Sequence, residues 1–131
     1  FDILHEGHIK ILELAKSQCE QLIVAVGTDE FMRERKGRES VLSYSERIRI
    51  VSAIRYVDKV VEETDLDKVA AYYKYKFDVM FVGDDHQQEA IYIRDAARLK
   101  KEYGVDTIYI KRSNVSSTEI RKRIYNMRVE E

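Results

Sequence analysis

The sequence of 131 residues contains no proline and no tryptophan, and its only cysteine is Cys19. Without proline, repeats or low-complexity segments, nothing marks a linker, so we expect a single domain over residues 1–131. A lone cysteine forms no internal disulfide, and no metal-binding spacing surrounds it. No apolar run approaches the roughly 20 residues that cross a bilayer, so we expect a cytoplasmic protein without membrane insertion.

The chain also lacks a large charge of either sign. Its 23 Lys and Arg residues balance 24 Asp and Glu residues, which gives a net charge of -1. A nearly neutral chain has no general attraction to nucleic acid or to anionic membranes. We therefore expect no nucleic-acid partner, and local basic clusters have to be judged separately.

What the sequence does have is a regular alternation of strand and helix patterns. Short apolar runs predict buried strands at 21–27, 57–61, 79–82 and 107–110. Helical spacing predicts helices at 8–18, from Thr64, and at 89–103 with Ile93, Ala96 and Ala97 inward. Two further helices are predicted after the capping box that begins at Ser43 and after Thr118. We interpret the charged residues 29–42 as a loop with a helical turn. This order predicts an α/β fold, a doubly wound, Rossmann-like parallel sheet with helices on both faces.

Ligands of open parallel sheets bind beyond the carboxyl ends of the strands. Four polar segments map to that edge, and we expect them to converge: residues 1–8, 28–38, 83–88 and 111–118.

The first of these segments, His5-Glu6-Gly7-His8, stands directly before a predicted helix. Gly7 allows a bulky group to approach the backbone, and a helix N-terminus favours phosphate. Two histidines at such a place can donate hydrogen bonds to charge that develops in a transition state. The alternatives are two surface histidines or a metal site, but no third ligand stands at a convincing spacing for zinc.

The other segments carry charged and hydroxyl side chains. Asp84 and Asp85 follow a strand, where they bind a nucleoside or magnesium or form a solvated loop. The stretch from Lys111 to Thr118 offers two cations and several hydroxyls at a helix start, which fits an anion site or plain capping. The basic run from Arg33 to Arg38 is a solvated face or a phosphate contact.

The segment Phe1-Asp2-x-x-His5-x-Gly7-His8 resembles the signature of the HxGH nucleotidyltransferases. Within that superfamily the chain looks most like the cytidylyltransferases, and among them it is most similar to the bacterial glycerol-3-phosphate cytidylyltransferases. Further landmarks follow in the family's order, and together they cover almost the whole chain: Gly27 to Phe31, Tyr44 to Arg47, Ile54 to Asp58, Val82 to Asp85 and Val115 to Thr118.

The resemblance implies an enzyme that transfers CMP from CTP to a phosphorylated small alcohol, most specifically glycerol 3-phosphate, and releases pyrophosphate. It implies magnesium (Mg2+) bound with the nucleotide, no protein ligand to a metal, and a homodimer. The implied catalytic residues are His5, His8 and Lys36. The implied nucleotide-binding residues are Phe1, Asp2, Gly7, His8, Asp85, Lys111, Arg112, Ser116, Ser117 and Thr118. Arg35 and Arg47 are implied at the acceptor, and Arg55 and Asp58 at the dimer interface.

The chain departs from the family pattern in three places. The family's last motif begins Arg-Thr-Glu-Gly, so either Lys111 or Arg112 takes the arginine position here. The basic loop is shifted by one residue, so Arg35, Lys36 and Arg38 compete for one role. A central strand precedes Phe-Asp in the family, and we therefore expect residues upstream of Phe1 in the natural protein.

Alternatives within the superfamily are an adenylyltransferase for a flavin or pantetheine phosphate, and a cytidylyltransferase for phosphocholine, phosphoethanolamine or another sugar or polyol phosphate. With nine Tyr and no Trp, the composition does not decide whether an aromatic cage for a quaternary ammonium exists. A nucleotide-binding module without catalysis belongs to a different class, and the intact His5, Gly7 and His8 argue against it.

Overall fold

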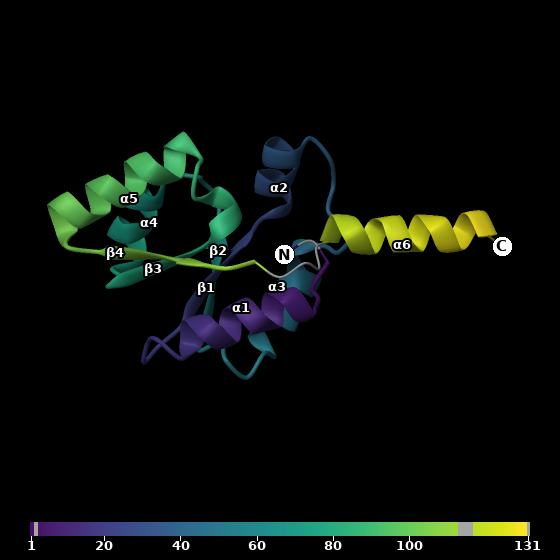
Figure 1. The fold of residues 1–131 in the computed structure, drawn as a ribbon, viewed down its shortest axis with the longest axis horizontal. Helices are drawn as coiled ribbons and strands as arrows, with labels where there is room; N and C mark the ends of the chain where they lie inside the picture. Colours follow the sequence, from purple (N-terminus) through teal and green to yellow (C-terminus); the bar gives the residue numbers. More distant parts are fainter. Residues whose placement is uncertain (2, 113–116, 131) are drawn as a thin grey trace. The chain divides into compact units, whose positions relative to one another are not determined.

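The computed structural model describes residues 1, 3–112 and 117–130. Its contacts divide the chain into two compact units (Figure 1), one comprising Phe1–Thr64 with Ser113–Glu131 and the other comprising Asp65–Arg112. Each unit is described by itself, and the single domain expected from the sequence stays a prediction. Among the described residues, no helix is both long enough and apolar enough to cross a membrane.

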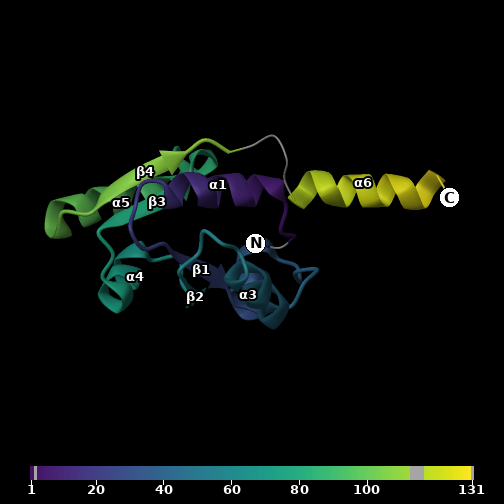
Figure 2. The same cartoon turned by 90° about the horizontal axis from the view of Figure 1, so that it is seen from below.

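The first unit is built around two parallel strands. Its elements are α1 (Glu6–Lys16), β1 (Ile23–Gly27), α2 (Asp29–Lys36), α3 (Tyr44–Ser52), β2 (Lys59–Glu63) and α6 (Ser117–Glu130). β1 pairs with β2 in parallel, with Ile23 opposite Lys59 and Gly27 opposite Glu63. Helix α3 contacts both strands, beside which Figure 2 shows it from below, and α2 contacts β1.

Capping side chains explain where α2 and α3 begin. Thr28 caps α2 by accepting a hydrogen bond from Phe31 N at 3.1 Å, and Gly37 ends that helix with a left-handed φ of 69°. Ser43 caps α3 by accepting from Glu46 N at 3.3 Å, which confirms the serine half of the predicted capping box, while Glu46 Oε1 accepts from Ser43 Oγ at 3.0 Å rather than from Ser43 N. The interpretation of 29–42 as a loop is therefore wrong for its first eight residues, because the hydroxyl of Thr28 and the left-handed glycine bound a helix there.

The second unit also holds a parallel strand pair. Its elements are α4 (Lys68–Tyr75), β3 (Val79–Gly83), a 3-10 turn (Asp84–His86), α5 (Ala90–Tyr103) and β4 (Asp106–Ile110). β3 pairs with β4 in parallel, with Val79 opposite Asp106 and Gly83 opposite Ile110. Its buried core consists of Val69, Met80, Val82, Tyr92, Leu99 and Val105.

The second unit corrects two expectations. Helix α4 begins after Asp67, not at Thr64, because Asp67 accepts hydrogen bonds from Val69 N and Ala70 N. Helix α5 buries Tyr92, Asp95 and Leu99 rather than Ile93, Ala96 and Ala97, and Ile93 is half exposed. The predicted α/β class with parallel strands between helices is confirmed.

Candidate functional site

His5 and His8 cap the first turn of α1 reciprocally. His5 Nδ1 accepts a hydrogen bond from Gly7 N at 3.0 Å, and His8 Nδ1 accepts one from His5 N at 3.2 Å. Because Nδ1 accepts in both rings, the hydrogen of each neutral imidazole lies on Nε2. The ring centroids are 4.0 Å apart, so two Nε2 donors are held next to each other at the start of a helix.

The start of α6 is tied to the chain just before this pair. Ser117 Oγ donates to Ile3 O at 3.0 Å and accepts from Ile3 N at 3.4 Å. Two of the predicted polar segments therefore meet within the first unit. The hydroxyl hydrogen of Ser117 is donated to Ile3 O. The group that this helix start can offer to an anion is therefore a backbone N–H rather than the Ser117 hydroxyl.

The ring of Phe1 lies against the histidine pair, with its centroid 4.9 Å from that of His8. Arg35 and Lys36 are exposed in the second half of α2, and which of Arg35, Lys36 and Arg38 contacts a phosphate stays a prediction.

Arg47 is almost fully buried, with 2% of its surface exposed. Its guanidinium donates to Gly27 O at 2.6 Å, to Leu42 O at 3.0 Å and to Asp29 Oδ1 at 2.7 Å. Arg47 thereby joins the end of β1, the start of α2 and the loop before α3. Sequence reasoning missed this joining role, although Gly27-Thr28-Asp29 was recognised as a landmark. Contact of Arg47 with an acceptor stays a prediction.

In the second unit, Asp85 and Arg112 form an ion pair at the end of β3. Arg112 Nη1 donates to Asp85 Oδ2 at 2.6 Å, and Arg112 N donates to Asp84 Oδ1 at 3.0 Å. A Cβ atom placed on Gly83 would lie 2.6 Å from Asp85 Oδ1, so the glycine makes room for this carboxylate. His86 Nδ1 lies 2.9 Å from Glu89 Oε1, and the His86 ring stacks on that of Tyr92 with centroids 4.6 Å apart. Two predicted nucleotide-binding side chains are thus paired with each other.

The other predicted site residues are placed as follows. Lys111 is exposed and makes no side-chain ion pair within the part of the chain that the structure describes. Thr118 is exposed on α6, and Gly7 is buried in α1. Asp2 and Ser116 lie outside the described residues.

The residues predicted at a dimer interface face the surface of the first unit. Asp58 Oδ2 accepts from Leu22 N and from Lys16 Nζ, each at 2.7 Å. The hydrogen bond from Lys16, followed by that from Leu22, holds the pKa of Asp58 below its ordinary value. The guanidinium of Arg55 lies 5.7 Å from the ring centroid of Tyr56. Asp58 thus joins the end of α1 to the start of β1, and its role in a dimer stays a prediction.

The described side chains form no cluster suited to a metal ion. No group of three or more His, Cys, Asp or Glu residues in that part of the chain is arranged to hold a metal ion. A magnesium ion that is carried by the triphosphate oxygens needs no such group. Magnesium bound with the nucleotide stays a prediction.

Comparison with known proteins identifies the family of this chain. The profile of the cytidylyltransferase-like family matches residues 1–123. The chain belongs to the cytidylyltransferase-like family. Glycerol-3-phosphate cytidylyltransferase of Bacillus subtilis is 35% identical over 126 residues, which cover 95% of this chain and 91% of that protein. The chain is accordingly a nucleotidyltransferase of this family.

Two further similarities widen the picture. FAD synthase of Pyrococcus abyssi is 36% identical over 131 residues, which cover 95% of this chain and 86% of that protein. The crystal structure of the lipopolysaccharide core biosynthesis protein from Thermoplasma volcanium superposes with a TM-score of 0.70 at 25% identity and covers 88% of this chain and 92% of that one. The cytidylyltransferase and the FAD synthase are thus about equally similar to this chain, at 35% and 36% identity.

Proposed function

We propose that this protein transfers CMP from CTP to glycerol 3-phosphate, giving CDP-glycerol and pyrophosphate. The observation that carries the transfer chemistry is the reciprocal capping of His5 and His8, which directs two Nε2 donors from one helix start. The 35% identity to a glycerol-3-phosphate cytidylyltransferase supports both the nucleotide and the acceptor.

The reaction is an in-line displacement at the α-phosphorus of CTP. A phosphate oxygen of the acceptor forms the new bond to that phosphorus, and the bond to the oxygen that bridges to the β-phosphate breaks, so pyrophosphate leaves. No covalent enzyme intermediate is involved. Negative charge spreads over the phosphorus oxygens in the transition state, and hydrogen-bond donors fixed beforehand lower its energy.

We assign different residues to different parts of the nucleotide. In this proposal the Nε2 donors of His5 and His8 stabilise the oxygens of the α-phosphate, and Lys36 contributes a positive charge to the same transition state. The start of α6 offers backbone N–H groups to the outer phosphates beside Ser117 and Thr118. Mg2+, bound with the triphosphate, neutralises part of the nucleotide's charge.

A second candidate is transfer of AMP from ATP to a flavin phosphate. The observation that favours it is the 36% identity to an FAD synthase. The transfer chemistry is the same, and the two candidates differ in nucleotide and acceptor.

A substrate matrix separates the candidates. The purified protein is incubated with Mg2+, with CTP or ATP, and with glycerol 3-phosphate, flavin mononucleotide, phosphocholine or phosphoethanolamine, and pyrophosphate release is followed. We expect turnover with CTP and glycerol 3-phosphate. Turnover only with ATP contradicts the proposal, and no turnover with any pair favours a binding module without catalysis.

Variants of His8 test the role of Nε2. We expect His8→Ala to lower kcat by about 10²-fold or more, as the loss of a transition-state donor does. His8→Asn keeps an acceptor near the Nδ1 position but has no atom at Nε2, so we expect it to restore helix stability without restoring kcat. Lys10→Ala, on the exposed face of the same helix, is the matched control with normal kcat. A His8→Asn enzyme with normal kcat removes Nε2 from the mechanism.

A further inference from the structure

A polar cleft of about 270 Å³ lies between the first turns of α2 and α3. It is lined by Asp29 and Arg33 of α2, by residues 39–41 of the connecting loop, and by Ser43 and Glu46 at the start of α3. None of these residues is among the catalytic, nucleotide-binding or acceptor-binding residues that the family resemblance implies, although Asp29 and Arg33 lie in the polar segment 28–38. The volume is slightly below the roughly 300–1,000 Å³ of typical ligand pockets, so the cleft suits a small molecule or one end of a larger one.

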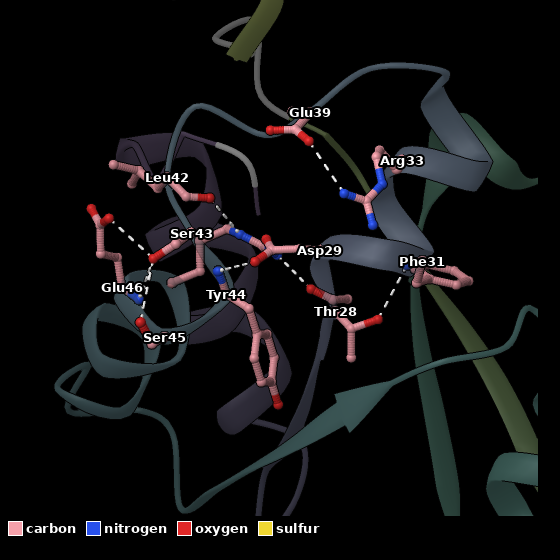
Figure 3. A network of polar contacts seen from close by, with 12 residues as sticks. Thr28, Asp29, Phe31, Arg33, Glu39, Leu42, Ser43, Tyr44, Ser45 and Glu46 are labelled. Carbon is pink, nitrogen blue, oxygen red and sulfur yellow. Dashed lines mark hydrogen bonds and ion pairs between the residues drawn. The ribbon is translucent and has the colours of Figure 1, made fainter.

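The walls of the cleft are fixed by contacts within the first unit (Figure 3). Asp29 is held by the buried guanidinium of Arg47 at 2.7 Å and by Tyr44 N at 3.2 Å. Arg33 reaches Glu39 across the connecting loop at 3.2 Å. On the α3 side, Ser43 Oγ lies 3.0 Å from Glu46 Oε1. Asp29 is therefore oriented by a buried arginine before a ligand binds, whereas the Arg33–Glu39 pair, at 48% and 78% exposure, can open to a ligand.

The chemistry of the lining matches a chain of hydroxyl groups. Carboxylates accept hydrogen bonds from hydroxyls, and the Arg33 guanidinium donates to hydroxyl oxygens. Arg47 pairs with Asp29, Arg33 pairs with Glu39, and Glu46 accepts a hydrogen bond from Ser43 Oγ, so each carboxylate of the lining has a donor beside it. Val41 is 65% exposed and gives the carbon chain an apolar contact.

Arg47 also connects the cleft with the histidine segment. Its guanidinium binds Asp29 on the cleft wall, and its side chain shares a packed apolar surface with Phe1 and Leu4. Lys36 is one helical turn beyond Arg33 on α2. An acceptor whose phosphate lies beside Lys36 can therefore place its carbon chain in the polar cleft, which is lined by residues of the same helix.

We propose that this cleft binds the hydroxyl-bearing carbon chain of the acceptor and makes the protein selective for polyol phosphates. This inference rests on the proposed transfer to a phosphorylated acceptor. It extends to both candidate acceptors, because glycerol 3-phosphate and the ribityl chain of flavin mononucleotide are polyol phosphates. Phosphocholine and phosphoethanolamine carry no hydroxyl chain.

Steady-state kinetics of cleft variants give the first test. Ser40→Tyr fills the cleft, and Glu46→Gln removes a carboxylate while keeping the shape of the side chain. We expect each to raise the KM of the polyol phosphate by about 3- to 10-fold, the loss of one or two hydrogen bonds, and to leave the KM of CTP unchanged. Glu34→Gln, an equal charge change on the exposed part of α2 outside the cleft, is the control. An unchanged acceptor KM in both cleft variants, with normal thermal unfolding, overturns the proposal.

A binding experiment keeps the test independent of turnover. The 15N-labelled protein is titrated with glycerol 3-phosphate, with flavin mononucleotide and with inorganic phosphate. We expect saturable shifts of the Ser40, Val41 and Ser43 amides with a polyol phosphate and none with inorganic phosphate. Equal shifts with inorganic phosphate, or no shift with either polyol phosphate, overturn the proposal.

The outcomes separate this inference from the proposed function. If ATP and flavin mononucleotide are the substrates, transfer to glycerol 3-phosphate is wrong, but the cleft proposal stands when Ser40→Tyr raises the KM of the flavin. If phosphocholine or phosphoethanolamine is the preferred acceptor, cytidylyl transfer stands and the cleft proposal falls. If no pair turns over, the titration alone decides.

Discussion

The carboxyl ends of β1 and β3 share a local pattern but differ in burial. Each strand ends in a glycine, and the aspartate two residues later pairs with an arginine from further along the chain. Asp29 binds Arg47 at 2.7 Å, and Asp85 binds Arg112 at 2.6 Å. The side chain of Arg47 is 1% exposed, whereas that of Arg112 is 44% exposed.

This difference separates a fixed structural contact from one that a ligand can replace. A buried guanidinium that loses its partners leaves an uncompensated charge, so its pair stays closed. An exposed pair contributes little to stability, because water screens it and solvates each charge when it opens. The ion pair at the end of β1 is therefore suited to hold the neighbouring elements in place. The ion pair at the end of β3 is suited to exchange its partners with a charged ligand.

The largest effect is expected from removing the buried cation. Arg47→Met breaks three hydrogen bonds and leaves Asp29 and two carbonyl groups without their donor. We expect it to lower the free energy of unfolding by about 2–5 kcal/mol, measured by urea denaturation, because each carbonyl that loses its donor costs about 1–3 kcal/mol. Arg47→Lys keeps the charge but not the planar donor geometry, and we expect it to recover only part of the loss. A stable Arg47→Met protein would remove the distinction between the two pairs.

Alanine at the two strand-ending glycines is expected to have the next largest effect. A Cβ atom on Gly27 would lie 2.9 Å from Phe31 Cδ1 and 3.0 Å from the sulfur of Met32, inside packed structure. We expect Gly27→Ala to cost about 1–3 kcal/mol in unfolding free energy, as overpacking does. On Gly83 the Cβ atom meets only the carboxylate of Asp85, which can swing away. Gly83→Ala should therefore cost less stability and raise the KM of the nucleotide, and equal losses at both sites would contradict this.

A smaller effect concerns pH and the buried pair. The hydrogen bond from Tyr44 N, followed by that from Arg47, holds the pKa of Asp29 below its ordinary value of 3.8. A lowered folded-state pKa adds stability above the unfolded value, and this stability is lost as the pH falls through the folded-state value. Wild type should thus exceed Asp29→Asn in urea midpoint at neutral pH, and the gap should shrink as the pH falls below 3.8. A gap that is constant down to about pH 3 would show that charge is not its cause.

The smallest effect on stability is expected at the exposed pair. Arg112→Met should change the free energy of unfolding by about 0–1 kcal/mol, measured as for Arg47→Met. If the pair exchanges with the nucleotide, the KM of CTP rises although stability does not fall. Lys111→Met tests the other cation at this strand end, and the variant with the larger rise in KM identifies the residue in the family's arginine position.

Most of the fold was predictable because it follows from local patterns. The apolar runs locate β1, β3 and β4, and the hydroxyl of Ser43 with Glu46 fixes the start of α3. Helix α2 was missed, because its charged sequence hides the two apolar residues, Phe31 and Met32, that pack on β1. The inward face of α5 was misplaced, because Asp95 is buried by accepting a hydrogen bond from Lys68 N, which hydrophobic spacing does not reveal.

The candidate site was predictable as a set of residues but not as contacts. Motifs point to His5, His8, Asp85 and Arg112 one by one. That the histidines cap each other, or that Asp85 takes up Arg112, depends on distances that sequence spacing does not contain. Arg47 is the clearest example, since an arginine near the ligand edge suggests a ligand contact, while burial assigns its donors to the protein itself.

The hydrogen bonds between Ile3 and Ser117 join positions 114 residues apart. The entropy cost of closing a loop rises slowly with its length, but contacts of such long range form late in folding. During synthesis, residue 117 emerges only after nearly all of this sequence has been made. The segment before His5 therefore gains its anchor on α6 as one of the last steps, so a chain that stops before α6 retains both histidines but never closes this loop.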